Sequence, residues 1–418
     1  MVRATTDRKV LAAAMVGETV AWYSWFLFSS GAIYISAAFL PPGDQMTSVT
    51  EILGVFAAGF LVRPLGAVAF GHYGDTRGRR KMLILTVLLV SASSAAIGAF
   101  PGYAQVGSAA IIPVIAAYLV LGFSLGGEWV GSLLLMMESS PEGGRAGRSA
   151  FAQATIGAGL LLGSVVYIAL GGILPPGVMT GYGWRVPFLL SVPFGVAALA
   201  MRLSIPETRL FGEVEARKLL AGFPLADVFR RHKRRLLLGT LIVGSSGTVF
   251  YVGAALLPVV FELLKVVTVQ AGQIGIAVMA MGEIAAVFVG GAASDHLGRR
   301  PLIWLTSWGL LALVYPAFYL QSGAAFMACM ALFGVAHGIG YAPIGTLISE
   351  VFPTNIRASG SSLTYQLGNS LISGPASFFS ALLGGFAFFL YPVYAVLWAL
   401  VAIGAVSMIP ETKDSALG

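Results

Sequence analysis

The chain has 418 residues, of which 57% are hydrophobic and only 10% are charged, and its mean hydropathy is +0.86. A soluble protein of this length could not cover so much apolar surface, so the composition excludes a water-soluble fold and points to lipid as the main solvent. The net charge of +7 could indicate a nucleic-acid partner, but the basic residues lie between apolar runs, where they act as topology signals instead.

Twelve apolar runs follow one another along the chain, each about 20 residues or longer, which is the length of a membrane-spanning helix. A transmembrane β-barrel would show short alternating segments instead. The first run is too long for a cleaved signal peptide and contains Glu18. We therefore predict an all-α membrane protein with twelve transmembrane helices near 12–39, 51–73, 82–101, 109–137, 149–173, 185–204, 236–261, 270–292, 301–321, 324–349, 359–385 and 387–409.

Basic residues mark alternate loops of this pattern. They precede the first run and follow each even-numbered run, whereas the other loops carry little beyond Arg185 and Lys265. By the positive-inside rule, both termini are expected on the cytoplasmic side of the plasma membrane. The basic stretch "FRRHKRR" at 229–235 is then a cytoplasmic anchor to anionic lipid headgroups and not a nucleic-acid patch.

A charged loop sequence occurs twice, 220 positions apart. It reads "GHYGDTRGRR" at 71–80 and "GAASDHLGRR" at 291–300. "PETR" at 206–209 and "PETK" at 410–413 form another matching pair. The repetition predicts two pseudo-symmetric six-helix halves, 1–204 and 236–418, joined by a cytoplasmic segment at 205–235. Parallel halves of this kind are a transporter architecture, with the substrate site between them near the bilayer midplane.

The repeated loops are predicted to form a cytoplasmic gate. Glycine permits a tight turn, aspartate can face a helix N-terminus, and arginine can bridge to carboxylates at other helix ends. If the arginines only set topology, the shared Gly and Asp spacing has no explanation. The predicted gate residues are Gly71, Asp75, Arg77, Gly78, Arg79, Arg80, Glu138 and Arg145 in the first half, and Gly291, Asp295, Gly298, Arg299, Arg300, Glu350 and Arg357 in the second.

The first loop resembles the GxxxDRxGRR-type motif of the major facilitator superfamily. Together with "LGFSLGGEW" (121–129), "GWRVPF" (183–188) and "SEVFPTNIRASGSSLTYQLG" (349–368), it resembles the metabolite–proton symporter family over the whole chain. The resemblance implies the twelve-helix major facilitator fold. It also implies proton-coupled import of organic acids or zwitterionic osmolytes, by a protein that generally works as a monomer.

The chain departs from that family at positions implied in substrate binding and proton coupling. In "GETVAWYSWF" (17–26), the family's Glu falls on Ala21 and its Asp falls on Ser24. In the fourth helix, the family's Arg falls on Tyr118 and its Gln falls on Leu121. These replacements leave open an uncoupled facilitator as an alternative to a symporter.

Five ionisable residues are expected inside the membrane. Their spacing from cytoplasmic charges, at about 1.5 Å per helical residue, places them roughly 13–20 Å deep. An ionised group there costs about 2.5–3.5 kcal/mol, so each should face protein or a water-filled cavity. They are Glu18, Arg63, Glu128, Glu283 and His337.

Glu18, Glu128, Glu283 and His337 are the candidates for proton coupling. Three of them have a simpler alternative: Glu18 could snorkel to the interface, Glu128 could be structural, and His337 could be a neutral hydrogen-bonded side chain. Arg63 could likewise anchor the nearby gate loop.

Arg63 and Glu283 also lie 220 positions apart, on opposite sides of the predicted pseudo-two-fold axis. They could clasp a zwitterion, or pair with each other in one state of a transport cycle. Further candidates for the cavity wall are Trp22, Tyr23, Trp25, Tyr118, Tyr365 and Gln366. Aromatic faces suit quaternary ammonium or ring-containing solutes, although ordinary packing would also explain each of them.

No nucleotide-binding loop, metal-ligand cluster or nucleophile–base motif occurs in the sequence, so we expect no enzymatic activity, metal or cofactor. We predict a secondary transporter that moves a small polar organic solute by alternating access, with protons and the lipid bilayer as its partners. The interior charges fit a zwitterion, a monocarboxylate or a neutral compound better than a multiply charged anion. An uncoupled facilitator, or a membrane sensor that kept the fold without the flux, is the alternative.

Overall fold

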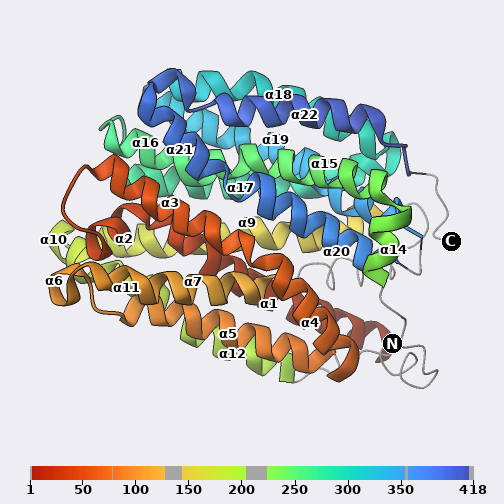
Figure 1. The fold of residues 1–418 in the computed structure, drawn as a ribbon, viewed down its shortest axis with the longest axis horizontal. Coiled ribbons are helices and arrows are strands. Elements are labelled where there is room, and N and C mark those ends of the chain that lie inside the picture. Colours follow the sequence, from red (N-terminus) through yellow and green to blue (C-terminus); the bar gives the residue numbers. More distant parts are fainter. Residues whose placement is uncertain (1, 78, 128–143, 204–223, 354–355, 414–418) are drawn as a thin grey trace.

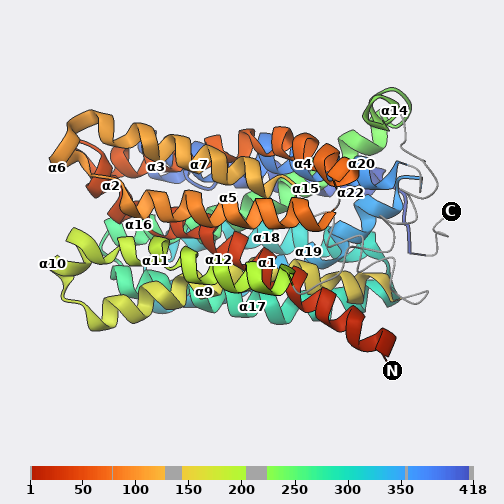
Figure 2. The same cartoon turned by 90° about the horizontal axis from the view of Figure 1, so that it is seen from below.

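The structure, a computed structural model, describes residues 2–77, 79–127, 144–203, 224–353 and 356–413. Within these ranges every regular element is a helix. The long helices run side by side along one axis, and the beginning of α1 and the end of α22 lie at the same end of the bundle (Figures 1 and 2). We call this the terminal end.

The first half begins with α1 (Val2–Ser30) and α2 (Ala32–Phe39), which form one span interrupted at Gly31. A side chain at Gly31 would overlap the hydroxyl of Tyr167, so the break lies where two helices approach closely. The rest of this half consists of α3 (Gln45–Leu61), α4 (Arg63–Arg77), α5 (Arg79–Ala99), α6 (Tyr103–Val106), η1 (Gly107–Ala110), α7 (Ile111–Leu125), α9 (Arg145–Ile173), α10 (Pro176–Val178), η2 (Met179–Gly183), α11 (Arg185–Leu189) and α12 (Ser191–Leu203).

The second half repeats this arrangement after the short α14 (Pro224–Arg231). Two of its spans contain one turn of π-helix, η3 and η4, a feature that often occurs at functional sites. Its elements are α15 (Lys233–Tyr251), η3 (Val252–Leu256), α16 (Leu257–Leu263), α17 (Val269–Leu297), α18 (Arg299–Tyr319), α19 (Gly323–Glu350), α20 (Arg357–Gly368), η4 (Asn369–Ser373), α21 (Ala376–Phe386), η5 (Phe388–Leu390) and α22 (Val393–Met408).

Within the described residues, each of the twelve predicted spans overlaps one of these helices or a run of consecutive helices, and residues 128–137 of the predicted fourth span lie outside them. Ten helices in the described ranges are long and apolar enough to cross a membrane. The two spans outside this set are α1, which carries Glu18, and the α20–η4–α21 run, which is rich in serine and contains Gln366 and Asn369. Both spans contribute polar side chains to the interior of the bundle.

The two halves meet along several helices. In the first half α1 packs on α9, and α9 packs along α17 of the second half (Figure 2). Helix α3 packs against α21, and α4 against α20, on the other side of the interface. The predicted linker at 205–235 is described only from residue 224 onward, and α15 already begins at Lys233.

Candidate substrate and proton site between the halves

Arg63 is the first residue of α4, immediately after the break that separates α4 from α3. Its side chain is 0% exposed. The guanidinium carbon lies 5.3 Å from the ring centroid of Trp22, 5.4 Å from that of Trp25 and 5.3 Å from that of Phe60. Among the described residues, none of its three nitrogens has a hydrogen-bond partner of normal geometry. Arg63 therefore lies in an aromatic cage, and it has no ion pair with a carboxylate among the described residues.

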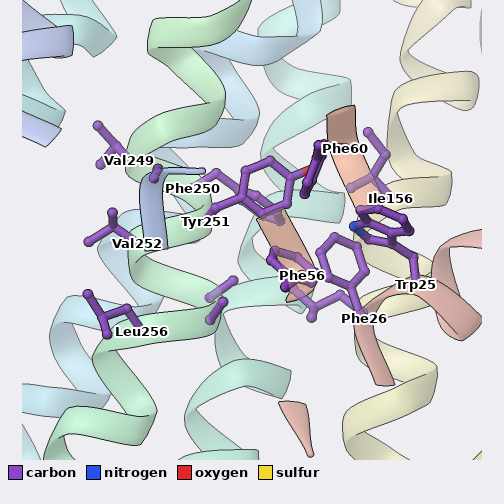
Figure 3. Packing of buried hydrophobic residues seen from close by; sticks show 14 of the residues in the cluster. Trp25, Phe26, Phe56, Phe60, Ile156, Val249, Phe250, Tyr251, Val252 and Leu256 are labelled. Atoms are coloured by element: carbon purple, nitrogen blue, oxygen red, sulfur yellow. The ribbon is translucent and has the colours of Figure 1, made fainter. Parts of the chain in front are cut away.

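The cage is formed by helices of both halves. Figure 3 shows Trp25, Phe56 and Phe60 gathered opposite Tyr251, which comes from α15. The ring centroids of Phe60 and Tyr251 are 5.0 Å apart. The hydroxyls of Tyr251 and Tyr365 lie close enough to interact electrostatically with Arg63. The guanidinium thus lies at the boundary between the halves, where the repeat pattern predicts the substrate site.

The three aromatic candidates of α1 lie on two different faces of the helix. Trp22 and Trp25 are three residues apart and share the face toward Arg63. Tyr23 points the other way: its hydroxyl donates to the carbonyl of Pro187 at 2.6 Å, and its ring meets Phe194 edge-on at 5.1 Å. In this structure the Tyr23 side chain therefore packs inside the first half, away from Arg63.

Tyr118 and Gln366 lie beside the cage in different roles. Tyr118 stacks on Trp25 and on Phe28, with centroid distances of 5.0 and 4.2 Å, so it supports the cage from behind. The amide nitrogen of Gln366 donates to the carbonyl of Gly126 at 2.9 Å, which joins α20 to the end of α7 in the other half. Tyr365, the neighbour of Gln366, is the residue of this pair that faces Arg63.

Glu283 and His337 form a buried pair on α17 and α19. Their side chains are 0% and 3% exposed, and His337 Nδ1 lies 3.1 Å from Glu283 Oε1. The remaining atoms, Glu283 Oε2 and His337 Nε2, have no hydrogen-bond partner among the described residues. The imidazole stacks on the Tyr341 ring with centroids 4.8 Å apart, and it lies tilted against the Phe250 ring at 4.5 Å. Two titratable groups therefore touch each other in an otherwise apolar setting.

A pair of tyrosine hydroxyls lies between the cage and this acid–histidine pair. Tyr341 Oη and Tyr365 Oη are 3.1 Å apart. Tyr365 interacts electrostatically with Arg63, and Tyr251 interacts with both Arg63 and Glu283. Arg63 and Glu283, predicted as counterparts across the pseudo-two-fold axis, do not form an ion pair in this structure, because Glu283 pairs with His337.

Glu18 is 2% exposed and lies between α1 and α9. Its Oε2 accepts a hydrogen bond from the Thr155 hydroxyl at 3.3 Å. The alternative in which Glu18 snorkels to an exposed interface is therefore wrong for this conformation. Ser24, which replaces the family's Asp, has its hydroxyl 3.3 Å from that of Ser191 in α12 and so faces the interior of the first half. Glu128 lies outside the described residues.

At the terminal end, the second copy of the repeated loop joins the two halves. Asp295 accepts hydrogen bonds from the backbone N–H groups of Ala146 and Gly147, at 3.1 and 2.8 Å, where α9 begins. A carboxylate at a helix N-terminus is stabilised by the helix dipole. Arg299 binds Asp295 at 3.0 Å within the same half.

Glu350, at the end of α19, forms ion pairs with two arginines of this network. It accepts from Arg299 at 3.1 Å and from Arg145 of the first half at 3.3 Å. The terminal end is therefore closed by a charged network with contributions from both halves. Arg357, also predicted for the gate, instead donates to the Ser349 carbonyl at 3.1 Å, inside its own half.

The "PETK" segment holds the second loop in place. Glu411 accepts from the backbone N–H groups of Arg299 and Arg300 at 2.9 and 3.0 Å, at the start of α18. Burial alone would raise the pKa of Glu411, but these donors, with the N–H groups of Lys413 and Thr412, hold the pKa below its usual value. Gly298 precedes them with φ of +102°, a conformation that favours glycine.

The first copy of the loop is described only in part. Arg80 donates to the backbone carbonyls of Arg202, at 3.4 Å, and of Leu203. Arg77 lies exposed, with its guanidinium carbon 5.9 Å from the ring centroid of Tyr73.

The glycines that open the two loop copies have different surroundings. A side chain at Gly71 would meet nothing within 4 Å, whereas a Cβ at Gly291 would lie 2.8 Å from the Ala146 carbonyl oxygen. The two copies thus differ in how closely they are packed. Gly78, Glu138 and the side chains of Asp75 and Arg79 lie outside the described parts of the chain.

The opposite end of the interface is joined by neutral amides. Gln273 of α17 donates to the Ser30 carbonyl at 2.8 Å, next to the break in the first span. Gln270 donates to the Ile168 carbonyl of α9 at 2.9 Å. Inter-half hydrogen bonds are therefore present at both ends, and the buried cage and acid–histidine pair lie between them.

Three residues of this site were missed from the sequence. Phe60 lies three positions before Arg63, a spacing that places both on one side of a helix. Tyr341 lies four positions after His337, which gives the observed stacking. Tyr251 carried no local signal, because its position opposite Phe60 depends on the packing of one half on the other.

A two-half helical bundle with a buried polar site between the halves defines the transporter class with parallel internal repeats. The family model described as "Major Facilitator Superfamily" matches residues 14–377, and the chain belongs to this family. It is therefore a transporter of the major facilitator class and not an enzyme, as predicted.

Relatives with similar sequences are named as transport proteins. An inner membrane metabolite transport protein of Escherichia coli, YhjE, is 30% identical over 89% of this chain and 87% of its own length. A proline/betaine transporter of Salmonella typhimurium is 28% identical over 88% of this chain and 76% of its own length. An ectoine/proline transporter of Corynebacterium glutamicum is 29% identical over the same shares.

Solved structures support the fold. The proton:xylose symporter XylE, bound to 6-bromo-6-deoxy-D-glucose, superposes with a TM-score of 0.77 at 17% identity and covers 99% of this chain and 98% of its own. The human organic anion transporter MFSD10 gives a TM-score of 0.68 at 15% identity, covering 97% and 99%. At these identities the likeness shows the fold alone, and it confirms the predicted twelve-helix, two-half class.

Proposed function

We propose that this protein moves a small organic solute carrying a single carboxylate across the plasma membrane, by proton-coupled symport and alternating access, with both termini in the cytoplasm. The observation that carries the proposal is the fully buried Arg63, whose guanidinium has aromatic rings and two tyrosine hydroxyls around it but no carboxylate partner among the described residues. A carboxylate would accept two parallel hydrogen bonds from this group.

The charges around Arg63 limit the class of solute. Glu283 and Glu18 are buried in the same interior, and both interact electrostatically with tyrosines of the site, Glu283 with Tyr251 and Glu18 with Tyr365. A second negative charge on the solute would face these carboxylates. A zwitterion or a monocarboxylate fits better, in agreement with relatives named as transporters of proline, betaine and ectoine.

The network at the terminal end supports alternating access. Asp295, Glu350 and Arg145 join the halves by hydrogen bonds and ion pairs that separate if the halves, 1–204 and 236–418, rock apart at this end. The positive-inside rule makes this the cytoplasmic gate. Gln270 and Gln273 then belong to the opposite, outward gate.

The competing proposal is an uncoupled facilitator. Ala21 and Ser24 stand where the resembling family has carboxylates, and the Ser24 hydroxyl is bonded inside the first half. Coupling then needs another carrier, and the buried Glu283–His337 pair supplies a candidate. A sensor without flux is the less favoured alternative, because closures are present at both ends of the interface.

The test is reconstitution into liposomes with an imposed proton gradient and a panel of labelled proline, glycine betaine, ectoine and lactate. We expect at least one solute to accumulate above equilibrium. Arg63→Lys keeps the charge but loses the planar fork, so the half-saturation concentration should rise about tenfold or more. Arg230→Lys on the exposed side of α14 is the matched control.

Equilibration that ignores the gradient would favour the facilitator. Unchanged half-saturation in Arg63→Lys would show that the carboxylate does not bind at the cage. A native protein that moves no member of the panel would contradict the proposed solute class.

A further inference from the structure

The interior of the described chain holds a carboxylate–imidazole contact that the proposed substrate site does not use, the Glu283–His337 pair. We infer that this pair carries the coupling proton, in place of the carboxylate that the family resemblance expects in the first helix, and that the Tyr341–Tyr365 hydroxyl pair links it to the substrate at Arg63. The inference rests on the proposed function and identifies its proton carrier.

The geometry suits a carrier that gains and loses one proton. With Glu283 ionised and His337 neutral, Nδ1–H donates to Oε1 across 3.1 Å and the pair has a net charge of −1. One added proton on Glu283 makes the pair neutral overall, as a carboxylic acid beside a neutral imidazole.

The pair lies where a change of conformation can reach it. Across the interface, a Cβ on Gly157 of α9 would stand 3.6 Å from Glu283 Oε2, the oxygen that has no hydrogen-bond partner among the described residues. Helices α9 and α17 belong to different halves and pack along each other. When the halves separate at one end, this oxygen becomes the side of the pair open to water.

The other titratable and charged groups facing the pair come from several elements. Tyr341 of α19 stacks on His337, and Tyr251 of α15 interacts electrostatically with Glu283. Tyr365 of α20 is bonded to Tyr341 and also interacts with Glu18 of α1. Arg63 of α4 is the cation of the set, and it reaches Tyr251 and Tyr365. Helix α9 contributes Gly157 beside Glu283.

This arrangement couples the two ligands by charge. In the empty site, the Arg63 cation stabilises the ionised form of the pair through the low dielectric of the interior. A solute carboxylate on Arg63 cancels that cation, so the pair becomes a stronger proton acceptor. Proton binding in turn removes a negative charge that opposes the solute carboxylate. Each ligand therefore raises the affinity for the other, as thermodynamic linkage requires.

The tyrosines give the coupling a defined route. A carboxylate on Arg63 would be reached by the Tyr365 hydroxyl, which is 3.1 Å from that of Tyr341. Tyr341 in turn lies against the His337 ring at 4.8 Å. Reorienting two hydroxyl protons along this route changes the dipole facing the imidazole. We assign Tyr341 and Tyr365 as positioning residues, because neither gains or loses a proton in this scheme.

The first measurement needs no transported solute. Infrared difference spectra of the purified full-length protein in lipid nanodiscs are recorded through a pH titration, following the carbonyl band of protonated carboxylic acids. We expect a titrating band that disappears in Glu283→Gln, shifts its midpoint in His337→Gln and persists in Glu18→Gln. A band unchanged in Glu283→Gln, or lost in Glu18→Gln, overturns the inference.

The second measurement separates the inference from the proposed function. In liposomes, Glu283→Gln should exchange labelled proline or betaine across the membrane at a rate within about threefold of the native protein, yet lose accumulation driven by the proton gradient. Tyr341→Phe should reduce accumulation more than exchange, whereas Tyr365→Phe, which removes a hydroxyl beside the proposed solute carboxylate, should reduce both. Native-like accumulation in Glu283→Gln would refute the carrier and leave the proposed function standing. A native protein with no flux would refute the proposed function, while the infrared titration still decides whether the pair is the proton-binding group.

Discussion

At the scale of single residues, Arg63 is the most demanding group in the described interior. A guanidinium does not lose its proton in proteins, so burial cannot be relieved by neutralisation. Removing such an ion from water costs several kcal/mol even after relaxation. Each aromatic face returns about 0.5–2 kcal/mol. The shortfall supports the proposal that a solute carboxylate binds at the cage and stabilises the buried guanidinium.

Ser24 provides a residue-scale test of where coupling resides. Its hydroxyl contacts Ser191, and Ser191 contacts Ser94 at 2.7 Å, all within the first half. Ser24→Asp restores the family's carboxylate but buries its charge among neutral hydroxyls. We expect a loss of about 2 kcal/mol or more in the free energy of unfolding and no gain in gradient-driven accumulation.

Thermal unfolding in detergent and accumulation in liposomes measure these two effects. Ser24→Ala is the control and should lose about 1 kcal/mol, the contribution of one hydrogen bond. A higher accumulation ratio in Ser24→Asp would show that helix one can still carry the proton.

The sequence predicted this site unevenly. Arg63 and Glu283 can be recognised in the sequence because an ionisable residue in an apolar run is costly to bury. The 220-residue repeat also identifies them as equivalent positions in the two halves. Residue type does not show which of Trp22, Tyr23 and Trp25 faces the cavity. The 3.6-residue period of the helix does place Tyr23 on a different face from the two tryptophans. Tyr251 opposite Phe60 could not be predicted, because that contact depends on how two distant helices pack.

At the scale of helices, hydropathy located each span but not its ends. The seventh span was predicted from 236, yet α15 begins at Lys233, and the third was predicted from 82, yet α5 begins at Arg79. Basic residues extend these helices beyond the apolar run into the headgroup region, where long charged side chains are stable. The length of an apolar run therefore indicates the part of the helix in contact with lipid, and it underestimates the full length of the helix.

Two neighbouring glycines of α17 separate packing within a half from packing between halves. A Cβ at Gly291 would lie 2.8 Å from the Ala146 carbonyl of the other half, and one at Gly290 would lie 2.5 Å from the Ile339 carbonyl of the same half. We expect Gly291→Ala to favour opening of the terminal end by about 1–2 kcal/mol, and so to raise the open population about 5- to 30-fold. Gly290→Ala should lower thermal stability instead.

Opening is measured as the rate at which a maleimide labels Ser149→Cys, a buried position of α9 on the inter-half surface, in a Cys329→Ser background. Gly290→Ala serves as the matched control, because it adds the same methyl group one residue away. Equal labelling rates in the two glycine variants would contradict the assignment of Gly291 to the gate.

At the scale of the whole molecule, the two closures differ in chemistry. The terminal end is joined by Asp295, Glu350 and Arg145, whereas the other end is joined by Gln270 and Gln273. Charged contacts are weakened by salt, and neutral amide contacts are much less affected. Both closures hold the same two rigid halves, so a transporter of this kind must break one set while the other stays formed.

A reversible crosslink across the terminal end tests that requirement. Ser149 Oγ and Thr346 Oγ lie 2.9 Å apart on opposite halves, close enough for cysteines at both positions to form a disulfide. Oxidation of Ser149→Cys/Thr346→Cys, in the Cys329→Ser background, should abolish solute flux, and a reducing agent should restore it, since the halves can separate at this end only without the bond. Each single cysteine variant, treated with the same oxidant, should keep its flux. Undiminished flux in fully crosslinked protein would mean that the solute crosses without separation of α9 from α19, and alternating access about this interface would be wrong.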